Sequence, residues 1–239
     1  MTKNMKKRDL LNYFAFQYSK RKLKASFNLK SFDAIYGFTQ TYVGRGYYDR
    51  ISLHQYKGEF EAFAEYVAKT KPKVVVEIGT KKGGSLYMWA RYFKPKHLIS
   101  IDLPGGIHGG GYPKQKRPFY ECFLDDEKAS KISLIQGDSH ANKTLEELKR
   151  LLNGEKIDFL FIDGDHRYEG VKQDFDMYKD LMNSGGLIGF HDIVASDYHH
   201  NMQCYVDKLW DELILEYKHK AFVQDPAQHK YGLGIVVMP

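Results

Sequence analysis

Cysteine is scarce in this chain of 239 residues, which contains only Cys122 and Cys204. Two cysteines provide neither a disulfide framework nor a zinc-binding spacing, so we expect inert thiols and a reducing, cytoplasmic location. No apolar run reaches the roughly 18 residues that a membrane-spanning helix needs. The start is rich in lysine but lacks the apolar segment of a secretory signal. Internal repeats and low-complexity tracts are also missing, and 43% of the residues are hydrophobic, which predicts one ordinary globular α/β domain.

Acidic residues are nearly missing from the N-terminus. Residues 1–30 contain nine Lys or Arg against the single acid Asp9 and so carry +8, which leaves −2 for the rest of the chain. The sequence therefore predicts a basic, aromatic extension, residues 1–57, that caps the main domain, residues 58–239, or contacts a second copy. A basic arm of this kind also attracts phosphate or anionic lipid. The simpler interpretation is a helix with one solvated face whose apolar side chains dock elsewhere, namely Leu10, Leu11, Phe14, Phe16 and Tyr18.

Strand and helix patterns alternate after residue 58, which is typical of a three-layer α/β sheet. We expect about seven strands, of which five are parallel and the last two, 220–224 and 232–238, form an antiparallel hairpin through Pro226. The expected parallel strands span residues 74–78, 97–102, 132–135, 157–163 and 187–190. The expected helices span residues 84–93, 119–129, 145–152, 168–182 and 202–210. A glycine-rich loop, residues 104–113, is a candidate lid or a plain surface loop.

Acids and imidazoles follow two strands that should lie side by side. The fourth expected strand ends in Asp163, followed by His166, and the fifth ends in His191 and Asp192. Parallel strands joined by a helix finish at the same edge of the sheet, so these four side chains should meet there. Two carboxylates and two imidazoles in one crevice predict a metal site or a proton-transfer site.

A glycine turn follows the first expected strand and leads into a helix. The turn contains Gly79, Thr80, Gly83 and Ser85, and Glu77 comes just before it. Glycines let the backbone approach a ligand, but the spacing is neither the dinucleotide fingerprint nor a P-loop. A carboxylate at Glu77 would repel a pyrophosphate, whereas it suits an amino group or a sulfonium.

Two further strand ends carry residues that suit a nucleoside. Asp102 ends the second expected strand, at a distance from the glycine turn that suits an acid binding a ribose diol. Asp138 and Ser139 end the third strand, where an adenine amino group would be recognised.

In order, these motifs resemble the class I S-adenosylmethionine-dependent methyltransferases over residues 58–239. Within that class the chain is similar to the metal-dependent O-methyltransferases, in the group of cephalosporin-hydroxylase-like and macrolide-sugar O-methyltransferase-like proteins. The resemblance implies a Rossmann-like methyltransferase sheet and S-adenosylmethionine as cofactor, bound by Glu77, Gly79, Thr80, Gly83, Ser85, Asp102, Asp138 and Ser139. It also implies methyl transfer to a hydroxyl of a small molecule, such as a sugar or a glycosylated metabolite.

The same resemblance implies a divalent metal, by default magnesium, held by Asp163 and Asp192, with His166 as the general base. His191 departs from the family pattern, because an acid is usual at that position. Imidazole suits Mn²⁺, Fe²⁺, Co²⁺, Ni²⁺ or Zn²⁺ better than Mg²⁺, so His191 either tunes the site to such an ion or points away from it.

Other functions stay open at this point. A metal-independent methyltransferase has the same fold and cofactor. A nucleotide-binding oxidoreductase is disfavoured by Glu77, and a hydroxylase would need an iron site of two histidines and one acid, for which His166, His191 and Asp163 are available. A nucleic-acid-binding module is not expected, because the main domain has no basic surplus.

Overall fold

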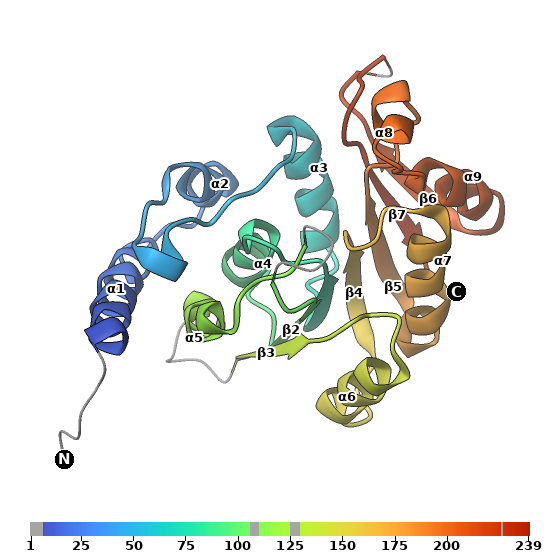
Figure 1. The fold of residues 1–239 in the computed structure, drawn as a ribbon. Coiled ribbons are helices and arrows are strands. Elements are labelled where there is room, and N and C mark those ends of the chain that lie inside the picture. The colour runs from blue at the N-terminus through green and yellow to red at the C-terminus, as the bar shows by residue number, and fades with distance from the viewer. Residues whose placement is uncertain (1–6, 106–109, 125–129, 226) are drawn as a thin grey trace.

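The computed structural model describes residues 7–105, 110–124, 130–225 and 227–239, and its centre is one seven-stranded sheet (Figure 1). The strand order is β3-β2-β1-β4-β5-β7-β6. Only β7 among these strands runs antiparallel to its neighbours β5 and β6, which confirms five parallel strands followed by an antiparallel pair. The strands are β1 (Val74–Ile78), β2 (His97–Asp102), β3 (Lys131–Gln136), β4 (Ile157–Ile162), β5 (Met182–His191), β6 (Lys218–Phe222) and β7 (Leu233–Val237).

Helices cover both faces of the sheet, so the predicted three layers are confirmed (Figure 1). One face packs against α3 (Lys57–Ala68), α4 (Gly84–Met88) and the π-helical turn η2 (Trp89–Phe93). The other face packs against α6 (Asn142–Leu152), α7 (Tyr168–Tyr178) and α9 (Val206–Glu216). Side chains alternate along each buried strand, so in β1 Val75 faces the α3 layer and Val76 faces the α7 layer.

Several predicted boundaries differ from the structure. The helix expected over 168–182 ends at Tyr178, and after the 3₁₀ turn η5 (Lys179–Leu181) Met182 already begins β5. The helix expected over 119–129 is a series of short turns: η3 (Lys114–Lys116), α5 (Arg117–Tyr120) and η4 (Glu121–Phe123). Residues 125–129, Pro226 and residues 106–109 of the candidate lid lie outside the described residues. A short helix, α8 (Asp197–Asn201), follows β5.

The N-terminal extension forms α1 (Lys7–Lys24), α2 (Phe32–Thr41) and the turn η1 (Gly46–Tyr48) beside the α4 layer (Figure 1). Leu23 of α1 and Ile35 of α2 are buried in the same hydrophobic layer as α3 and α4. The expectation that the apolar side chains of α1 dock is only partly right: Phe16 packs against this layer, but Leu10, Leu11, Phe14 and Tyr18 are exposed. The domain division at residue 58 stays a prediction. Among the described residues, no helix is both long and apolar enough to cross a membrane.

Candidate active site

The predicted cluster forms at the carboxyl ends of β4 and β5. Asp163 directly follows β4, where its backbone N–H donates to Ile78 of the neighbouring β1. His191 is the last residue of β5, and Asp192 comes next with a left-handed φ of 62°, which non-glycine residues seldom adopt. The Asp192 carboxylate lies beside the imidazoles of His166 and His191. Strained backbone conformations of this kind are concentrated at functional sites.

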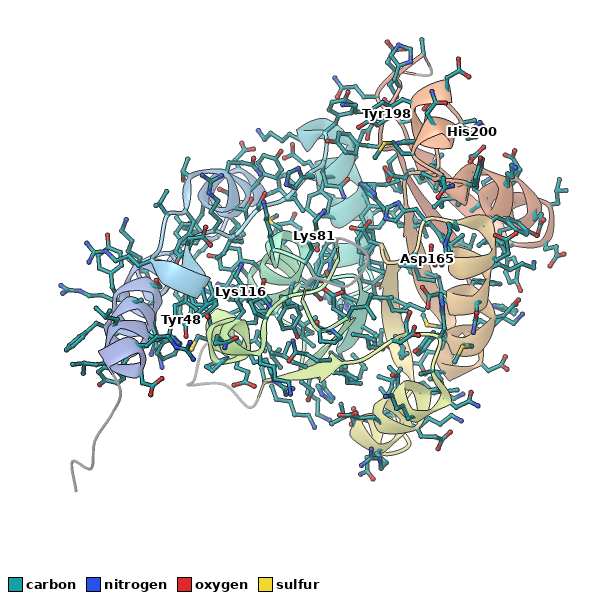
Figure 2. All side chains as sticks on the ribbon, in the orientation of Figure 1. Tyr48, Lys81, Lys116, Asp165, Tyr198 and His200 are labelled. Carbon is teal, nitrogen blue, oxygen red and sulfur yellow. The ribbon has the colours of Figure 1, made fainter. Side chains whose placement is uncertain are left out.

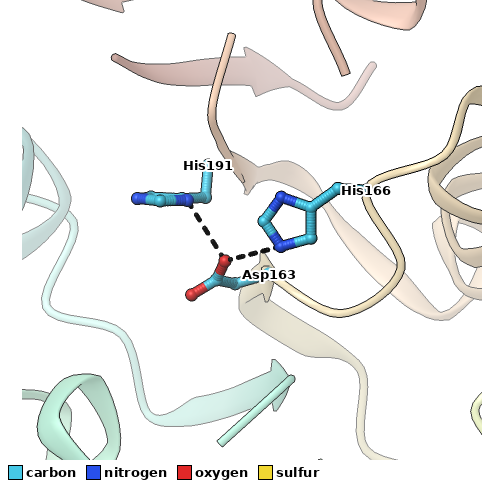
Figure 3. Close-up of side chains that lie close together, drawn as sticks. All are labelled: Asp163, His166 and His191. Carbon is cyan, nitrogen blue, oxygen red and sulfur yellow. Dashed lines mark ion pairs between the residues drawn. The ribbon is translucent and has the colours of Figure 1, made fainter. Parts of the chain in front are cut away.

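Four side chains of the cluster lie within hydrogen-bonding or ion-pairing distance of one another. The Oδ1 atom of Asp163 is 3.4 Å from Nε2 of His166 and 3.2 Å from Nδ1 of His191 (Figure 3). Asp192 completes the group, with Oδ2 at 2.9 Å from Nδ1 of His166 and Oδ1 at 3.1 Å from Nδ1 of His191. The structure therefore brings together all four residues that the sequence predicted at this edge.

Opposite charges shift the pKa values in this cluster strongly. Burial acts to raise the pKa of Asp163, but the imidazoles of His191 and His166 more than offset it and hold the pKa at about 2. The pKa of Asp192 is lowered for the same reasons. Burial acts to lower the pKa of His191, yet the two carboxylates raise it to about 10. Two carboxylates thus hold a positive charge between them in a buried site.

The cluster also has polar atoms without hydrogen-bond partners in the described chain. Both ring nitrogens of His191 and the Oδ1 atom of Asp192 are buried and make no hydrogen bond with suitable geometry. Leaving such atoms unpaired is costly, which favours an additional ligand. Asp163, His166 and His191 place one donor atom each within 4.8 Å of one another, a spacing that would fit a metal ion.

Two further residues reach the cluster that the sequence did not predict as part of it. His199, on α8, lies with Nε2 at 3.5 Å from Oδ1 of Asp192, while its own nitrogens contact the Val194 carbonyl and the Tyr231 N–H. Cys204, expected to be inert, has its sulfur 3.7 Å from Nδ1 of His166 and forms a second potential metal-binding group with His166 and Asp192. Both residues come from the segment between β5 and α9, whose only helix, the five-residue α8, is too short to give a periodic pattern.

The glycine turn between β1 and α4 is built mainly from internal contacts. Gly79 has a φ of 91°, and a Cβ there would lie 2.0 Å from the Asp163 carbonyl oxygen, so only glycine lets the turn lie against the cluster. The Thr80 hydroxyl lies 2.6 Å from that of Ser100 and thus has a partner inside the protein. Gly83 has a φ of 73° and abuts the Tyr120 ring, and Ser85 is buried at the start of α4.

Glu77 points into the layer of α3 and α4. It is fully buried, and its Oε2 accepts a 2.7 Å hydrogen bond from the indole N–H of Trp89. Burial raises the pKa of Glu77 to about 8, against which hydrogen bonds from Ser85 and Thr80 act. The carboxyl is therefore largely protonated at neutral pH, and its expected charge contact with a cofactor stays a prediction.

Asp102 holds the glycine turn in shape. Its carboxylate accepts backbone hydrogen bonds from Thr80 at 3.0 Å, Lys81 at 2.6 Å and Leu103 at 2.8 Å. A carboxylate has about four acceptor positions, so one remains for a ligand hydroxyl.

Asp138 is exposed just after β3, and its carboxylate accepts a hydrogen bond from the His140 N–H, while the Ser139 carbonyl accepts one from the Tyr178 hydroxyl. These roles in binding a nucleoside stay predictions.

Comparison with known proteins identifies the domain. Residues 76–193 match the family model described as a methyltransferase domain. The match runs from β1 to just past Asp192 and so contains both the glycine turn and the cluster. The chain contains a methyltransferase domain. This assignment supports the resemblance to class I methyltransferases and gives no support to the oxidoreductase or the nucleic-acid-binding module.

A curated relative matches only part of this chain. An uncharacterised protein of Acanthamoeba polyphaga mimivirus is 39% identical over 117 residues, which make up 49% of this chain and 50% of that protein. The chain thus matches about half the length of this relative.

Solved structures agree with the methyltransferase fold. The O-methyltransferase TomG from Streptomyces achromogenes, in complex with S-adenosylmethionine, superposes with a TM-score of 0.59 at 15% identity, over 98% of this chain and 100% of that chain. An O-methyltransferase from Bacillus cereus, in complex with S-adenosylhomocysteine, gives a TM-score of 0.54 at 16% identity, over 94% and 90%. At such low identity the likeness shows the fold alone, and it confirms the Rossmann-like methyltransferase sheet.

Proposed function

We propose that this methyltransferase transfers the methyl group of S-adenosylmethionine to a hydroxyl of a small molecule, with a divalent metal ion held by the cluster. The observation that carries the proposal is the buried group of Asp163, His166, His191 and Asp192, with its unpaired donor atoms, directly beside the glycine turn of a methyltransferase domain. An acceptor with adjacent hydroxyls, such as a sugar or a glycosylated metabolite, would suit a metal with two open positions.

The cofactor would lie along the turn from Gly79 to Ser85. Asp102 would bind the ribose with its remaining acceptor position, since three backbone N–H groups already fix its carboxylate. Asp138 and Ser139 would contact the adenine from the end of β3. The solved O-methyltransferases with bound S-adenosylmethionine or S-adenosylhomocysteine share this fold, which supports the choice of cofactor.

The donor set of the cluster fits a divalent ion. Asp163, His191 and Asp192 would hold it, because they offer two carboxylates and an imidazole whose nitrogens have no hydrogen-bond partner in the described chain. An imidazole ligand favours Mn²⁺ or another transition ion over Mg²⁺. When bound, the ion would lower the pKa of the acceptor hydroxyl and hold it in place.

His166 would act as the general base. Oδ2 of Asp192 lies 2.9 Å from Nδ1 of His166 and would keep the proton on that nitrogen. Nε2, on the opposite side of the ring and facing Asp163, would then be the atom that accepts the proton of the hydroxyl. The sulfonium donor already has a good leaving group, so positioning and deprotonation are the remaining tasks of the protein.

A binding experiment tests the cofactor. Calorimetric titration of the purified protein should show binding of S-adenosylhomocysteine and no binding of NAD⁺ at the same concentrations. If S-adenosylhomocysteine does not bind, the proposal is wrong at its first step.

A turnover experiment tests the metal and the acceptor class. We expect release of S-adenosylhomocysteine from S-adenosylmethionine with catechol or methyl glycosides as probes, loss of this release with EDTA, and recovery with Mn²⁺. Release that EDTA leaves unchanged would favour the metal-independent methyltransferase instead. A cytoplasmic location and a homo-oligomer formed through the N-terminal extension remain part of the proposal, and size-exclusion chromatography of the full chain tests the oligomer.

A further inference from the structure

A buried lysine lies near the glycine turn without an acid to pair with. Lys116, on η3, is only 8% exposed, and it forms no ion pair within the part of the chain that the structure describes. Its Nζ has one long contact, 3.5 Å to the Arg50 carbonyl oxygen, and lies 5.8 Å from the centre of the Tyr120 ring. Buried lysines are rare unless they pair with an opposite charge, and this ammonium group has no such ion pair in the described chain.

The contacts of Lys116 lead directly to the turn. The Tyr120 ring that it faces abuts Gly83, where an added Cβ would lie 2.7 Å from the ring, and the Tyr120 hydroxyl donates to the Lys81 carbonyl at 2.8 Å. On the other side, Ser52, two residues after Arg50, forms a parallel bridge with Gly83. Lys116 therefore lies next to the turn with Tyr120 between them, although it comes 37 positions after Gly79 in the sequence; Figure 2 labels Lys116 and Lys81 of the turn.

An acid, Asp49, and a second lysine, Lys82, both act on the ammonium group of Lys116. Burial lowers the pKa of Lys116, the field of Asp49 opposes this shift, and the charge of Lys82 adds to it. Lys82 itself is exposed in the glycine turn and has no ion pair among the described residues. Two ammonium groups without ion pairs among the described residues thus act on each other near the glycine turn, and both would attract an anion.

We propose that Lys116 and Lys82 form an anion-binding subsite at the glycine turn, which takes a carboxylate or a phosphate group of a bound ligand. The proposal rests on the proposed function for one of its two sources, the α-carboxylate of S-adenosylmethionine. With the ribose on Asp102, whose carboxylate holds the N–H groups of Thr80 and Lys81, the amino-acid end of the cofactor would extend along this turn. The other source is an acidic group on the methyl acceptor.

Calorimetry on the full chain distinguishes these sources. The ligands are S-adenosylhomocysteine, which has the α-carboxylate, and 5′-methylthioadenosine, which lacks the amino-acid group but keeps the nucleoside and the sulfur. Inorganic phosphate, titrated into the S-adenosylhomocysteine complex, probes an acceptor anion. The variants are Lys116→Met, which keeps the length of the side chain without its charge, and Lys82→Gln. Lys114→Gln, an exposed lysine of the same turn η3, is the matched control.

For the cofactor as source, Lys116→Met should weaken S-adenosylhomocysteine binding about tenfold or more, since a charge-assisted hydrogen bond is lost. The affinity for 5′-methylthioadenosine should stay within about twofold of the wild-type value. Lys114→Gln should change the affinity for neither ligand. Lys82→Gln should give a smaller loss, because that side chain is exposed to solvent. Unchanged S-adenosylhomocysteine binding together with lost phosphate binding would support the subsite with the acceptor as source.

Two results would overturn the proposal. In the first, Lys116→Met changes the affinity for neither S-adenosylhomocysteine nor phosphate. In the second, it weakens the binding of S-adenosylhomocysteine and of 5′-methylthioadenosine equally, which would mean a purely structural role. Thermal unfolding without ligand checks the fold, and Lys116→Met should melt no lower than the wild type, because it removes a buried unpaired charge. If S-adenosylhomocysteine does not bind the wild type at all, the proposed function fails, and the phosphate titration alone then decides the subsite.

Discussion

The cluster at the ends of β4 and β5 and the glycine turn after β1 lie in contact, but they use their side chains in opposite ways. In the cluster, Asp192 and His191 are buried with donor or acceptor atoms that lack hydrogen bonds in the described chain. In the turn, Thr80 and Asp102 already have partners inside the protein. The cluster therefore has polar atoms open to a further partner, whereas the side chains of the turn mainly fix its own shape.

This difference explains why one glycine serves both regions. Gly79 brings the turn against the Asp163 carbonyl, so the shape of the turn and the position of the cluster depend on the same contact. Single substitutions can separate the two regions, and their expected effects range from a loss of the fold's stability to a change in metal affinity.

Gly79→Ala should damage both regions at once. A Cβ would lie 2.0 Å from the Asp163 carbonyl oxygen, at a φ of 91° that alanine disfavours. We expect a loss of about 3 kcal/mol or more in the free energy of unfolding. Urea denaturation measures it.

Gly37→Ala is the matched control, because Gly37 lies within α2 and an added Cβ there meets nothing within 4 Å. This variant should gain about 0.5–1 kcal/mol from helix propensity. Equal stability of the Gly79→Ala and Gly37→Ala variants would contradict the proposed contact between turn and cluster.

Glu77→Gln should change how stability depends on pH without disturbing the cluster. The folded protein holds the Glu77 proton up to about pH 8, whereas the unfolded chain loses it near the ordinary value of 4.5. The unfolded state thus binds fewer protons in this interval, and this group lowers stability as pH rises from about 4.5 to 8. The difference in unfolding free energy between variant and wild type should grow by a few kcal/mol over that interval, on the order that the shift implies.

Urea denaturation at several pH values measures this difference. Glutamine keeps an oxygen for the Trp89 N–H, so the hydrogen bond itself is preserved in the comparison. Parallel pH profiles of the two proteins would show that Glu77 is ionised in the folded state, which would contradict a protonated carboxyl at neutral pH.

His199→Gln should weaken metal binding without abolishing it. Nε2 of His199 lies 3.5 Å from Oδ1 of Asp192, so its ring packs beside a proposed ligand from outside the metal site. Partners of this kind change metal affinity about 10- to 100-fold. Calorimetric titration with Mn²⁺ measures the effect, with His219→Gln, an exposed histidine of β6, as control. If the two variants bind Mn²⁺ with the same affinity, His199 has no role in metal binding.

The sequence predicted the cluster better than the turn, for a physical reason. Asp163, His191 and Asp192 are fixed by the ends of two adjacent parallel strands, and the rule that such ends share an edge is enough to place them. The seven-stranded architecture followed from the same alternation of strands and helices. By contrast, the alternation of side chains within β1 was overlooked: Glu77 shares the face of Val75, and therefore meets Trp89.

The residues that no pattern predicted come from the connections between the longer helices and strands, in short helical turns or beside them. His199 and Cys204 reach the cluster from the segment after β5, and Lys116 reaches the turn from the loop after β2. The positions of such side chains depend on tertiary packing and on loop conformations, for which a single sequence has no periodic signal.

The most direct test of the central claim is a calorimetric titration of metal-stripped protein with Mn²⁺ and with Mg²⁺, for the wild type and for Asp192→Asn. We expect one site per chain that binds Mn²⁺ more tightly than Mg²⁺, because an imidazole is among the ligands, and whose heat disappears in Asp192→Asn. Binding of S-adenosylhomocysteine should persist in that variant. A wild type that binds neither ion, or an Asp192→Asn variant that binds Mn²⁺ as tightly as the wild type, would contradict the assignment of the cluster as a metal site.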